Sequence, residues 1–382
     1  MRVLVISNLF PPRELGGYER TCAAFVGRLR DRGHVVRVLT SDHPPTRATA
    51  GGEEWPGVDR ALRFRGLQDP PLATLRNDRR DLTVTLRTVR EYAPDAITLW
   101  GMNGLSRALV PGLRVAGAPI SARVGDSWLD NLLRLRARQH GAKRLARAVL
   151  GVPLTGDLGH VQRWVFNSRY MLDSARLLGL DAPDASVVHS GVDVDAIPRR
   201  PPAPWRGRLL YLGRIDAHKG VDTAVRAVAA IDGASLRVVG PGEPAAVGEL
   251  STLIDEHHVS DRVEIRPPVD RQGAIAELAR ADAVLFPARW PEPWGKVPLE
   301  AMAAGVPVIA SGTGGSAEYL RDGENALVAA PDDPTRWTRA IGRIARDEQL
   351  RATLRQAGFA TAARYSERRA NDGLMRELLG IA

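Results

Sequence analysis

The chain has 382 residues, longer than one compact core usually extends, so we expect two domains. Its one cysteine, Cys22, excludes an internal disulfide framework, which fits a reducing compartment and predicts a cytoplasmic protein. The formal net charge of +9 favours an anionic ligand or surface, and no apolar run approaches the roughly 18 residues that a membrane-spanning helix needs.

The first 200 residues alternate predicted strands and helices. Residues 2–7, RVLVIS, form a short apolar run that two prolines soon follow, which indicates a buried strand and not a signal peptide. Apolar residues recur at helical spacing in 18–33, and a strand is predicted at 34–41. Further strands are predicted at 95–101, 119–126, 164–168 and 185–193. This alternation is typical of βαβ units and therefore of a parallel sheet covered by helices.

A second alternating series follows a proline-rich segment at 199–205, the best candidate for a linker. Its predicted elements are strands at 208–214, 235–242, 262–267, 281–287 and 306–311 and a helix at 219–231. The sequence therefore predicts an α/β protein with two doubly wound, Rossmann-like domains, 1–200 and 201–365, and a C-terminal helix at 366–382 that packs back toward the first domain. Ligands bind beyond the carboxyl ends of such strands, so the predicted site is the cleft between the domains.

Two loops carry groups suited to anions. Gly16 and Gly17 precede a predicted helix, where glycine lets backbone N–H groups approach a phosphate; a plain tight turn is the alternative. Arg214 and Lys219 lie between a strand and a helix in YLGRIDAHKG. Two cations there can bind a diphosphate, although a solvated pair of surface charges is an equally ordinary interpretation.

The most informative stretch is PEPWGKVPLEAMAAGVPVIASGTGG, residues 291–315. Seven residues separate Glu292 from Glu300, and Gly295 and Pro298 between them indicate a close turn and the first turn of a helix. Each carboxylate can accept hydrogen bonds from a vicinal diol. Alternatively, Glu300 only stabilises the helix N-terminus, and Glu292 is an exposed acid of the loop. The occurrence of both glutamates together with the glycine, the lysine and the following strand argues against both alternatives holding at once.

These motifs resemble the retaining glycosyltransferases of family 4, which have the GT-B fold. Residues 287–328 resemble the donor-site signature, and YLGRIDAHKGVD resembles a second signature. SNLFPPRELGGYER resembles the N-terminal glycine loop, and VVHSGVDVDAI the loop before the linker. The resemblance covers nearly the whole chain. It implies an acceptor-binding domain at 1–200 and a domain at 201–365 that binds the donor, a nucleotide-diphosphate sugar.

The resemblance also implies roles for individual residues. Arg214 and Lys219 should hold the diphosphate, Glu300 the ribose hydroxyls, and Glu292 a hydroxyl of the transferred sugar. The remaining predicted donor-binding residues are Gly16, Gly17, Gly213, Gly295, Lys296 and Val297. Positive charge near the leaving diphosphate would stabilise the transition state, so Arg214 and Lys219 are predicted to be catalytic. Glu292 is predicted to be catalytic through its contact with the transferred sugar.

One departure from the family concerns the strand end at GDSW. Gly125 stands where many relatives carry histidine, which puts that histidine's contact with the donor in doubt, and Asp126 follows it as a further candidate catalytic residue. In a retaining front-face mechanism the leaving phosphate takes the acceptor's proton, and no protein nucleophile, metal or cofactor is expected. The acid pair at Asp193 and Asp195 is therefore interpreted as a loop feature.

The resemblance implies a hexosyltransferase that uses a nucleotide-diphosphate sugar, with a UDP-sugar as the first expectation and guanosine, adenosine and thymidine forms as alternatives. The acceptor is unidentified and is expected to be a specialised metabolite, a polysaccharide or a lipid-linked glycan. A sugar-nucleotide epimerase of the same fold and a nucleotide-sugar binding protein without turnover remain alternatives. Nucleic acid is not expected, because the cations stand beside glycines at strand ends. The basic segment 132–150 is either a solvated helix or a peripheral contact with the inner face of an anionic membrane.

Overall fold

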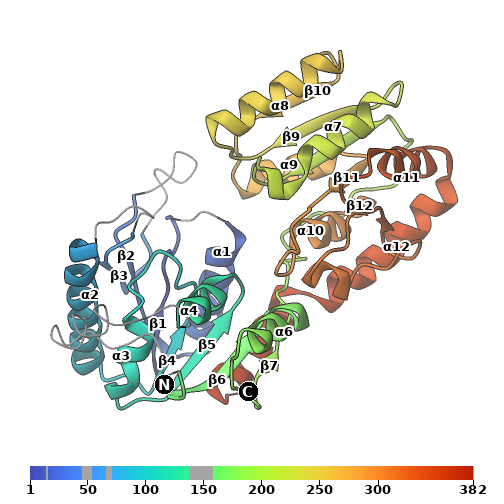
Figure 1. Ribbon diagram of the computed structural model, residues 1–382. Helices are drawn as coiled ribbons and strands as arrows, with labels where there is room; N and C mark the ends of the chain where they lie inside the picture. Colours follow the sequence, from blue (N-terminus) through green and yellow to red (C-terminus); the bar gives the residue numbers. More distant parts are fainter. Residues whose placement is uncertain (14–15, 45–53, 66–70, 137–157, 382) are drawn as a thin grey trace. The chain divides into compact units, whose positions relative to one another are not determined.

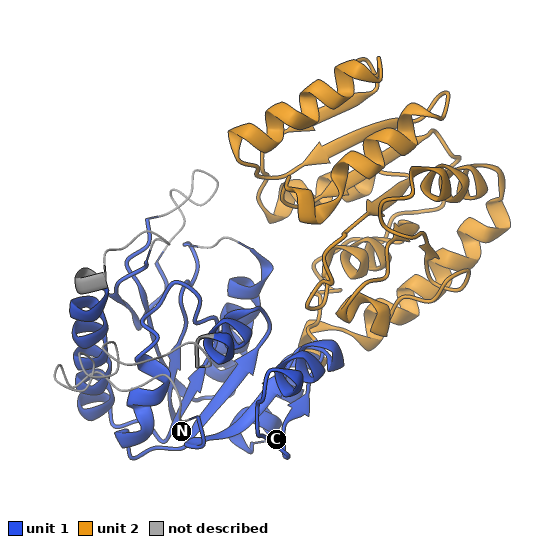
Figure 2. Ribbon diagram, viewed as in Figure 1, with its two compact units in different colours: residues 1–189, 370–382 blue, residues 190–369 orange. Residues whose placement is uncertain are grey.

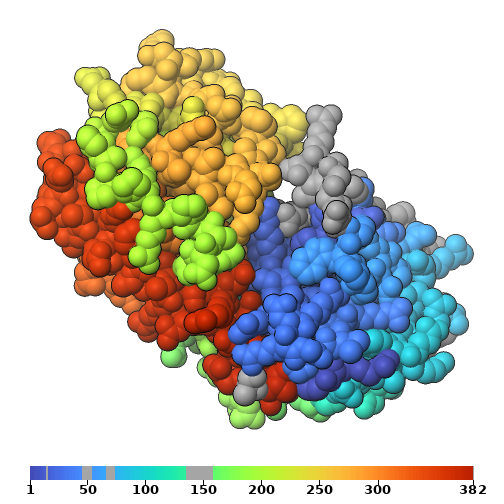
Figure 3. All heavy atoms as spheres, turned by 180° about the vertical axis from the view of Figure 1, so that it is seen from behind, coloured from blue at the N-terminus to red at the C-terminus, as the bar shows by residue number. Residues whose placement is uncertain are grey.

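The computed structural model describes residues 1–13, 16–44, 54–65, 71–136 and 158–381 (Figure 1). These residues form two compact units: unit 1 comprises 1–189 and 370–382, and unit 2 comprises 190–369 (Figure 2). The chain therefore passes from one unit to the other twice. Figure 3 shows the atoms from behind, coloured by residue number. The red C-terminal residues belong to unit 2 up to Arg369 and to unit 1 from Ala370 onward.

Unit 1 is built on a parallel sheet whose described strands have the order β3-β2-β1-β4-β5-β6-β7. The strands are β1 (Arg2–Ile6), β2 (Val35–Ser41), β3 (Val58–Leu62), β4 (Ala96–Leu99), β5 (Ile120–Val124), β6 (Val161–Phe166) and β7 (Ser186–Val187). The helices are α1 (Gly17–Asp31), α2 (Pro71–Tyr92), α3 (Leu109–Gly112), α4 (Trp128–Arg136), α6 (Arg169–Leu177) and α13 (Glu367–Leu374), followed by a π-helix at Met375–Leu379.

Side chains of β1 alternate between two hydrophobic cores, as the pleat of a strand requires. Val3 and Val5 pack with apolar residues of α1 and of the C-terminal helix. Leu4 and Ile6 face the opposite side and pack with residues of α2, α3, α4 and α6. Burial on both faces explains why β1 reads as a continuous apolar run.

Unit 2 repeats this architecture with a parallel sheet of order β10-β9-β8-β11-β12-β13 among its described strands. The strands are β8 (Arg208–Leu212), β9 (Ser235–Val239), β10 (Val263–Arg266), β11 (Ala283–Phe286), β12 (Val308–Ala310) and β13 (Leu327–Val328). The helices are α7 (Val221–Ala229), α8 (Pro244–Glu256), α9 (Arg271–Arg280), α10 (Val297–Ala304), α11 (Pro334–Arg346) and α12 (Glu348–Arg364). Leu209 and Tyr211 of β8 face one core, and Leu210 and Leu212 face the other.

The predicted fold class is confirmed, since both units are parallel sheets covered by helices on their two faces. In both sheets the strand order reverses beside the first strand, β1 or β8, which is the point where doubly wound sheets bind ligands. The domain boundaries were predicted at residues 200 and 365. In the structure the chain passes between the units at 189/190 and at 369/370.

Candidate active site

The loop after β8 carries Arg214, the first predicted diphosphate-binding cation. Gly213 has φ 151°, and its N–H donates a hydrogen bond of 3.1 Å to the carbonyl of Val239 at the end of β9. The Tyr211 hydroxyl donates to the carbonyl oxygen of Arg214 at 2.5 Å. These bonds fix the backbone, and the Arg214 side chain is 63% exposed and lies 3.5 Å from the Asp216 carboxylate in an ion pair at the carboxyl end of β8.

Lys219, the second cation, is fixed by the turn that begins helix α7. The Asp216 carboxylate accepts hydrogen bonds from the N–H groups of His218 and Lys219 at 3.0 and 3.1 Å. Gly220 follows with φ 65°, and a Cβ atom there would lie 2.1 Å from the carbonyl oxygen of Pro287. The β8–α7 loop therefore packs directly against the residue that follows β11, and a side chain at 220 would not fit.

Glu292 lies against Lys219, from which it is separated by 73 positions in the sequence. The Lys219 ammonium donates to Glu292 Oε1, and Glu292 is buried. The backbone of Glu292 is held from the other side, because its carbonyl accepts a hydrogen bond of 2.7 Å from the N–H of Gly315. Gly314 has φ 61°, and a Cβ atom there would lie 2.5 Å from that carbonyl oxygen, so glycine is required at 314 for this contact.

Helix α10 begins immediately after Gly295 and carries Glu300 in its first turn. Gly295 has φ 79°, and its carbonyl accepts a hydrogen bond of 2.6 Å from the Tyr319 hydroxyl. Lys296 occupies the N-cap position and makes no side-chain cap, so the first N–H groups of the helix stay available to an anion. Pro298 fits this first turn because a proline there removes no helical hydrogen bond.

Glu292 and Glu300 both lie near the side chain of Tyr319. Burial raises the pKa of Tyr319 well above its ordinary value, and the negative charges of Glu292 and Glu300 raise it further. The pKa of Tyr211 is also raised, by burial first and then by the charges of Asp216 and Glu292. Both tyrosines therefore stay neutral and serve as supports for a site that combines carboxylates with cations.

Some of these supporting residues were not predicted from the sequence. Tyr319 gave no local pattern that pointed to the site. Gly314 and Gly315 lie just beyond the predicted strand at 306–311 and could have been recognised as a close approach of backbones. Trp294 is buried and packs on Tyr319 and Tyr365, with ring centroids 4.9 and 5.2 Å away, so it belongs to the core.

In unit 1, Asp126 lies at the carboxyl end of β5. Its Oδ1 accepts hydrogen bonds from the N–H of Trp128 at 2.8 Å and from Nδ2 of Asn103 at 3.3 Å. Burial raises the pKa of Asp126 to about 6, and the charge of Asp130 adds to the rise. Gly125 stands directly before it, at the end of the same strand.

The N-terminus of α1 carries Gly16 and Gly17, the predicted phosphate-closing glycines. The N–H of Gly16 donates to Glu19 Oε2 at 3.0 Å, and Glu19 is buried. A carboxylate of the chain therefore already takes one of the N–H groups that were expected to bind phosphate. The role of these two glycines stays a prediction.

Two further sequence features have ordinary surroundings in the structure. Asp193 forms an ion pair of 3.2 Å with Arg271, and Asp195 is exposed. Within the described ranges, no three side chains of the types that ligate metals come together. The expectation that the reaction needs neither a metal nor a cofactor stays a prediction.

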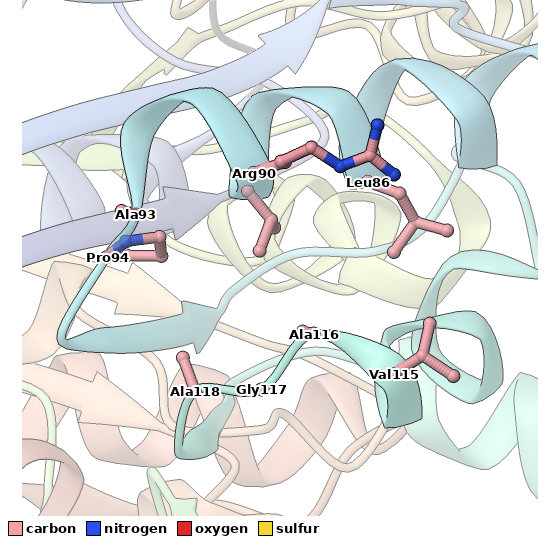
Figure 4. A pocket seen from close by; sticks show the side chains of 9 residues that line it. Leu86, Arg90, Ala93, Pro94, Val115, Ala116, Gly117 and Ala118 are labelled. Carbon is pink, nitrogen blue, oxygen red and sulfur yellow. The ribbon is translucent and has the colours of Figure 1, made fainter.

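A pocket of about 450 Å³ opens in unit 1 between the end of α2 and the segment 115–118 (Figure 4). Arg90 and Leu86 of α2 line one side of it, and Val115, Ala116 and Ala118 line the facing side. The pocket precedes β4 and β5 in the chain, so it lies at the amino ends of these strands. The candidate site residues lie at the carboxyl ends, and the pocket is therefore not part of the site.

The predicted membrane-contacting segment, 132–150, lies largely outside the described residues, which stop at Arg136 and resume at Leu158. Among the helices that the structure describes, none combines the length and the apolar character needed to cross a membrane.

Comparison with known families places both halves of the chain. Residues 15–196 match the family described as Glycosyltransferase Family 4, and residues 200–361 match the one described as Glycosyl transferases group 1. The chain is 30% identical over 393 aligned positions to a GDP-mannose-dependent alpha-(1-6)-phosphatidylinositol monomannoside mannosyltransferase of Mycobacterium tuberculosis. That alignment covers 94% of this chain and 92% of the relative.

Other similarities are more restricted. A D-inositol 3-phosphate glycosyltransferase of Xylanimonas cellulosilytica is 33% identical, but the alignment spans only 50% of each protein. Among solved structures, the Anabaena protein HepE in complex with UDP-glucose superimposes with a TM-score of 0.75 over 100% of both chains, at 19% identity. At that identity the likeness establishes the GT-B fold alone.

Proposed function

The chain belongs to the family-4 glycosyltransferases of the GT-B fold, and we propose that it moves a hexose, with retention of configuration, from a nucleoside-diphosphate sugar to a hydroxyl group of an acceptor. Unit 2 carries the residues proposed for the donor. The acceptor is a sugar or a polyol, in keeping with the acceptors that the names of the relatives state.

The observation that carries this proposal is the contact between Lys219 and Glu292. A cation from the β8–α7 loop and a carboxylate from the loop after β11 meet beside the N-terminus of α10. A diphosphate needs fixed positive charge and free N–H groups, and a sugar needs hydrogen-bond acceptors for its hydroxyls. All of these groups gather at the carboxyl end of one parallel sheet, where such sheets bind ligands.

Arg214 and Lys219 would bind the diphosphate and stabilise the negative charge that grows on it as the anomeric bond breaks. Glu300 would accept hydrogen bonds from the ribose hydroxyls, and Glu292 from a hydroxyl of the transferred sugar. The backbone at Gly295, Lys296 and Val297 would face the donor at the start of α10. These assignments follow from the resemblance of the two motifs to the donor-site signatures of the family.

Retention requires that the acceptor oxygen attack the face that the diphosphate leaves. The bond between the anomeric carbon and the phosphate oxygen breaks, the bond to the acceptor oxygen forms, and the acceptor's proton passes to the departing phosphate oxygen. Glu292 is unsuited to be a nucleophile in this scheme because it is buried against Lys219. The one-bond carbon–hydrogen coupling at the anomeric centre of the product reports the configuration directly.

Two donor bases are candidates. The sequence favours UDP, and the mycobacterial relative that aligns over 94% of the chain is named as GDP-mannose-dependent. Calorimetric titration of the protein with UDP and GDP, with EDTA present, compares the two bases and tests metal independence together. We expect one diphosphate to bind in preference to the other, and the corresponding nucleotide sugar to turn over.

Glu300→Ala is the matched test of the donor site. Loss of the ribose contact should weaken diphosphate binding about tenfold or more, as the removal of one good charge-assisted contact does. Glu324→Ala changes an exposed glutamate elsewhere in unit 2 and should leave the affinity unchanged. Equal affinities for both variants and the wild-type protein would remove Glu300 from the site. Binding without any sugar transfer or hydrolysis would favour a binding protein, and a changed sugar in the free nucleotide would indicate an epimerase.

A further inference from the structure

Two glycines that follow neighbouring strands of unit 1 lie close to the ring of Tyr18. Gly101 lies after β4, and Gly125 lies after β5. A Cβ atom at 125 would lie 2.1 Å from Cε2 of Tyr18. A Cβ atom at 101 would lie 2.5 Å from Oδ1 of Asn8 and 3.2 Å from Cε1 of the Tyr18 ring. The two edges of the Tyr18 ring therefore face the carboxyl ends of two adjacent strands, and a side chain at 125 cannot coexist with the ring in this position.

Several contacts hold the ring in place. Tyr18 belongs to the first turn of α1, and its hydroxyl donates a hydrogen bond of 2.7 Å to the carbonyl oxygen of Arg123 in β5. The Trp100 ring packs on it with centroids 5.9 Å apart. Burial raises the pKa of Tyr18 well above its ordinary value, so the side chain is a neutral wall and not a base. The residue is nevertheless only half-buried, so part of its surface faces outward.

Polar side chains lie beside this ring. Asp126 follows Gly125 directly, and its two hydrogen bonds with described residues both use Oδ1, which leaves Oδ2 for a hydroxyl donor. Asn103 donates to Asp126 and accepts a hydrogen bond of 3.1 Å from Asn131, so its orientation is fixed. An aromatic ring beside fixed hydrogen-bonding groups suits a ligand with one apolar C–H face and several hydroxyls, such as a pyranose or a cyclic polyol.

We propose that Tyr18 determines substrate specificity in unit 1: its ring takes the space that a side chain at position 125 would need and, with Asp126 and Asn103, forms the surface that binds a hydroxyl-rich six-membered ring. The proposal rests on the proposed function, and the ring is that of the transferred sugar or that of the acceptor. Tyr18 and Gly125 form a matched pair, because a side chain at 125 would meet the ring.

The test compares Tyr18→Ala, Gly125→His and the double variant with the wild-type protein. Hydrolysis of the nucleotide sugar reports on the transferred sugar, and transfer to methyl α-mannopyranoside or myo-inositol reports on the acceptor. Each single change should lower kcat/KM about tenfold in the affected arm, and Gly125→His should be much less harmful when Tyr18 is already alanine. Loss in hydrolysis assigns the contact to the transferred sugar, and loss in transfer alone assigns it to the acceptor.

Tyr92→Ala is the matched control, because the Tyr92 hydroxyl also donates to a strand carbonyl, that of Val35, at 2.8 Å, and the residue is buried. Its loss should lower the melting temperature and leave kcat/KM unchanged. The proposal would be overturned if the two substitutions affected each other only in the melting temperature and Tyr18→Ala kept the same kcat/KM as Tyr92→Ala. Tyr18 would then be a packing residue. Calorimetry of diphosphate binding separates this outcome from failure of the proposed function. If the wild-type protein binds the diphosphate, the proposed donor site stands even when Tyr18 proves to be a packing residue.

Discussion

At the scale of single residues, the pairing of Lys219 with Glu292 joins stability to function. Glu292 is buried, and Lys219 donates to its carboxylate in the structure. A buried carboxylate is costly without a partner, so the cation that would bind the diphosphate also makes the position of Glu292 tolerable. The pattern of two glutamates could be predicted from the sequence, but this contact could not, because it depends on how two loops from different strands meet.

A double substitution separates these two roles. Lys219→Ala should destabilise the protein by about 1–3 kcal/mol, because it leaves the Glu292 carboxylate without its charged partner. Adding Glu292→Gln removes the charge and should recover most of that stability, whereas kcat should stay low in both variants. Urea denaturation measures the first effect and steady-state kinetics the second. Recovery of kcat along with stability would show that neither side chain takes part in the reaction.

Asp126 gives the reaction an expected pH dependence. Because burial raises the pKa of this carboxyl to about 6, it carries the negative charge that makes it a strong acceptor for hydroxyl groups only above that pH. We expect kcat/KM to fall as the pH drops through about 6 and the acid limb to disappear, at a lower rate, in Asp126→Asn. The same limb in wild-type protein and variant would assign it to another group.

The raised pKa of Asp126 also makes the stability of the protein depend on pH. Asp126 binds its proton more tightly in the folded state, so its contribution to stability is complete below pH 4 and is lost as the pH rises through about 6. Asp126→Asn removes this loss and should therefore be more stable than wild type at pH 8, by up to about 3 kcal/mol, with the difference vanishing below pH 4. Thermal unfolding at both pH values measures it, and an advantage that does not change with pH would contradict the assignment.

At the scale of elements, the turn before α10 sets the direction of the helix N-terminus. Gly295 has φ 79°, and a Cβ atom there would lie 3.1 Å from the Phe286 ring. Gly295→Ala should cost about 1–2 kcal/mol and weaken donor binding, because the alanine strains the turn that aims the first N–H groups of the helix. Gly248→Ala in α8, where nothing lies within 4 Å, should be neutral or stabilising. Unchanged donor affinity in Gly295→Ala would show that the turn does not orient the site.

Elements with strong apolar patterns could be predicted from the sequence, and those with mixed patterns could not. β1, β8 and β11 were predicted because burial on both faces makes them continuous apolar runs. β3 was missed because it is an edge strand in which only Leu62 is buried, and its charged residues hide the strand signal. The long helix α2 was not predicted either, since arginines and threonines interrupt its apolar spacing.

At the scale of the whole molecule, unit 1 is made from two separate parts of the chain. Leu374, Met375 and Leu378 are buried among residues of β1 and α1, and Asp372 pairs with Arg28 at 3.1 Å. A helix at the C-terminus was predicted to return to the first domain, and residues 370–382 do belong to unit 1. The sequence could not place the passages between the units, because no local pattern marks 189/190 or 369/370.

Truncation of one buried side chain tests this dependence. Leu374→Ala should lower the stability of unit 1 by about 2–5 kcal/mol, as the loss of a large buried side chain does. Leu177→Ala, which changes a leucine that is 89% exposed in the same unit, should have little effect. Two-transition unfolding curves would assign the loss to a unit, and equal stability of the two variants would show that the C-terminal helix contributes no core.

The divided construction of unit 1 also fixes an order for biosynthesis. A ribosome completes all of unit 2 before it makes residues 370–382, whereas β1 and α1 are made first and must wait for them. During translation, therefore, the apolar face of β1 and α1 is incompletely covered while unit 2 is free to fold. During synthesis the sheet of unit 1, made before unit 2, is therefore covered only after unit 2 is complete. The apolar residues exposed at that stage are the part of the chain that chaperones would bind.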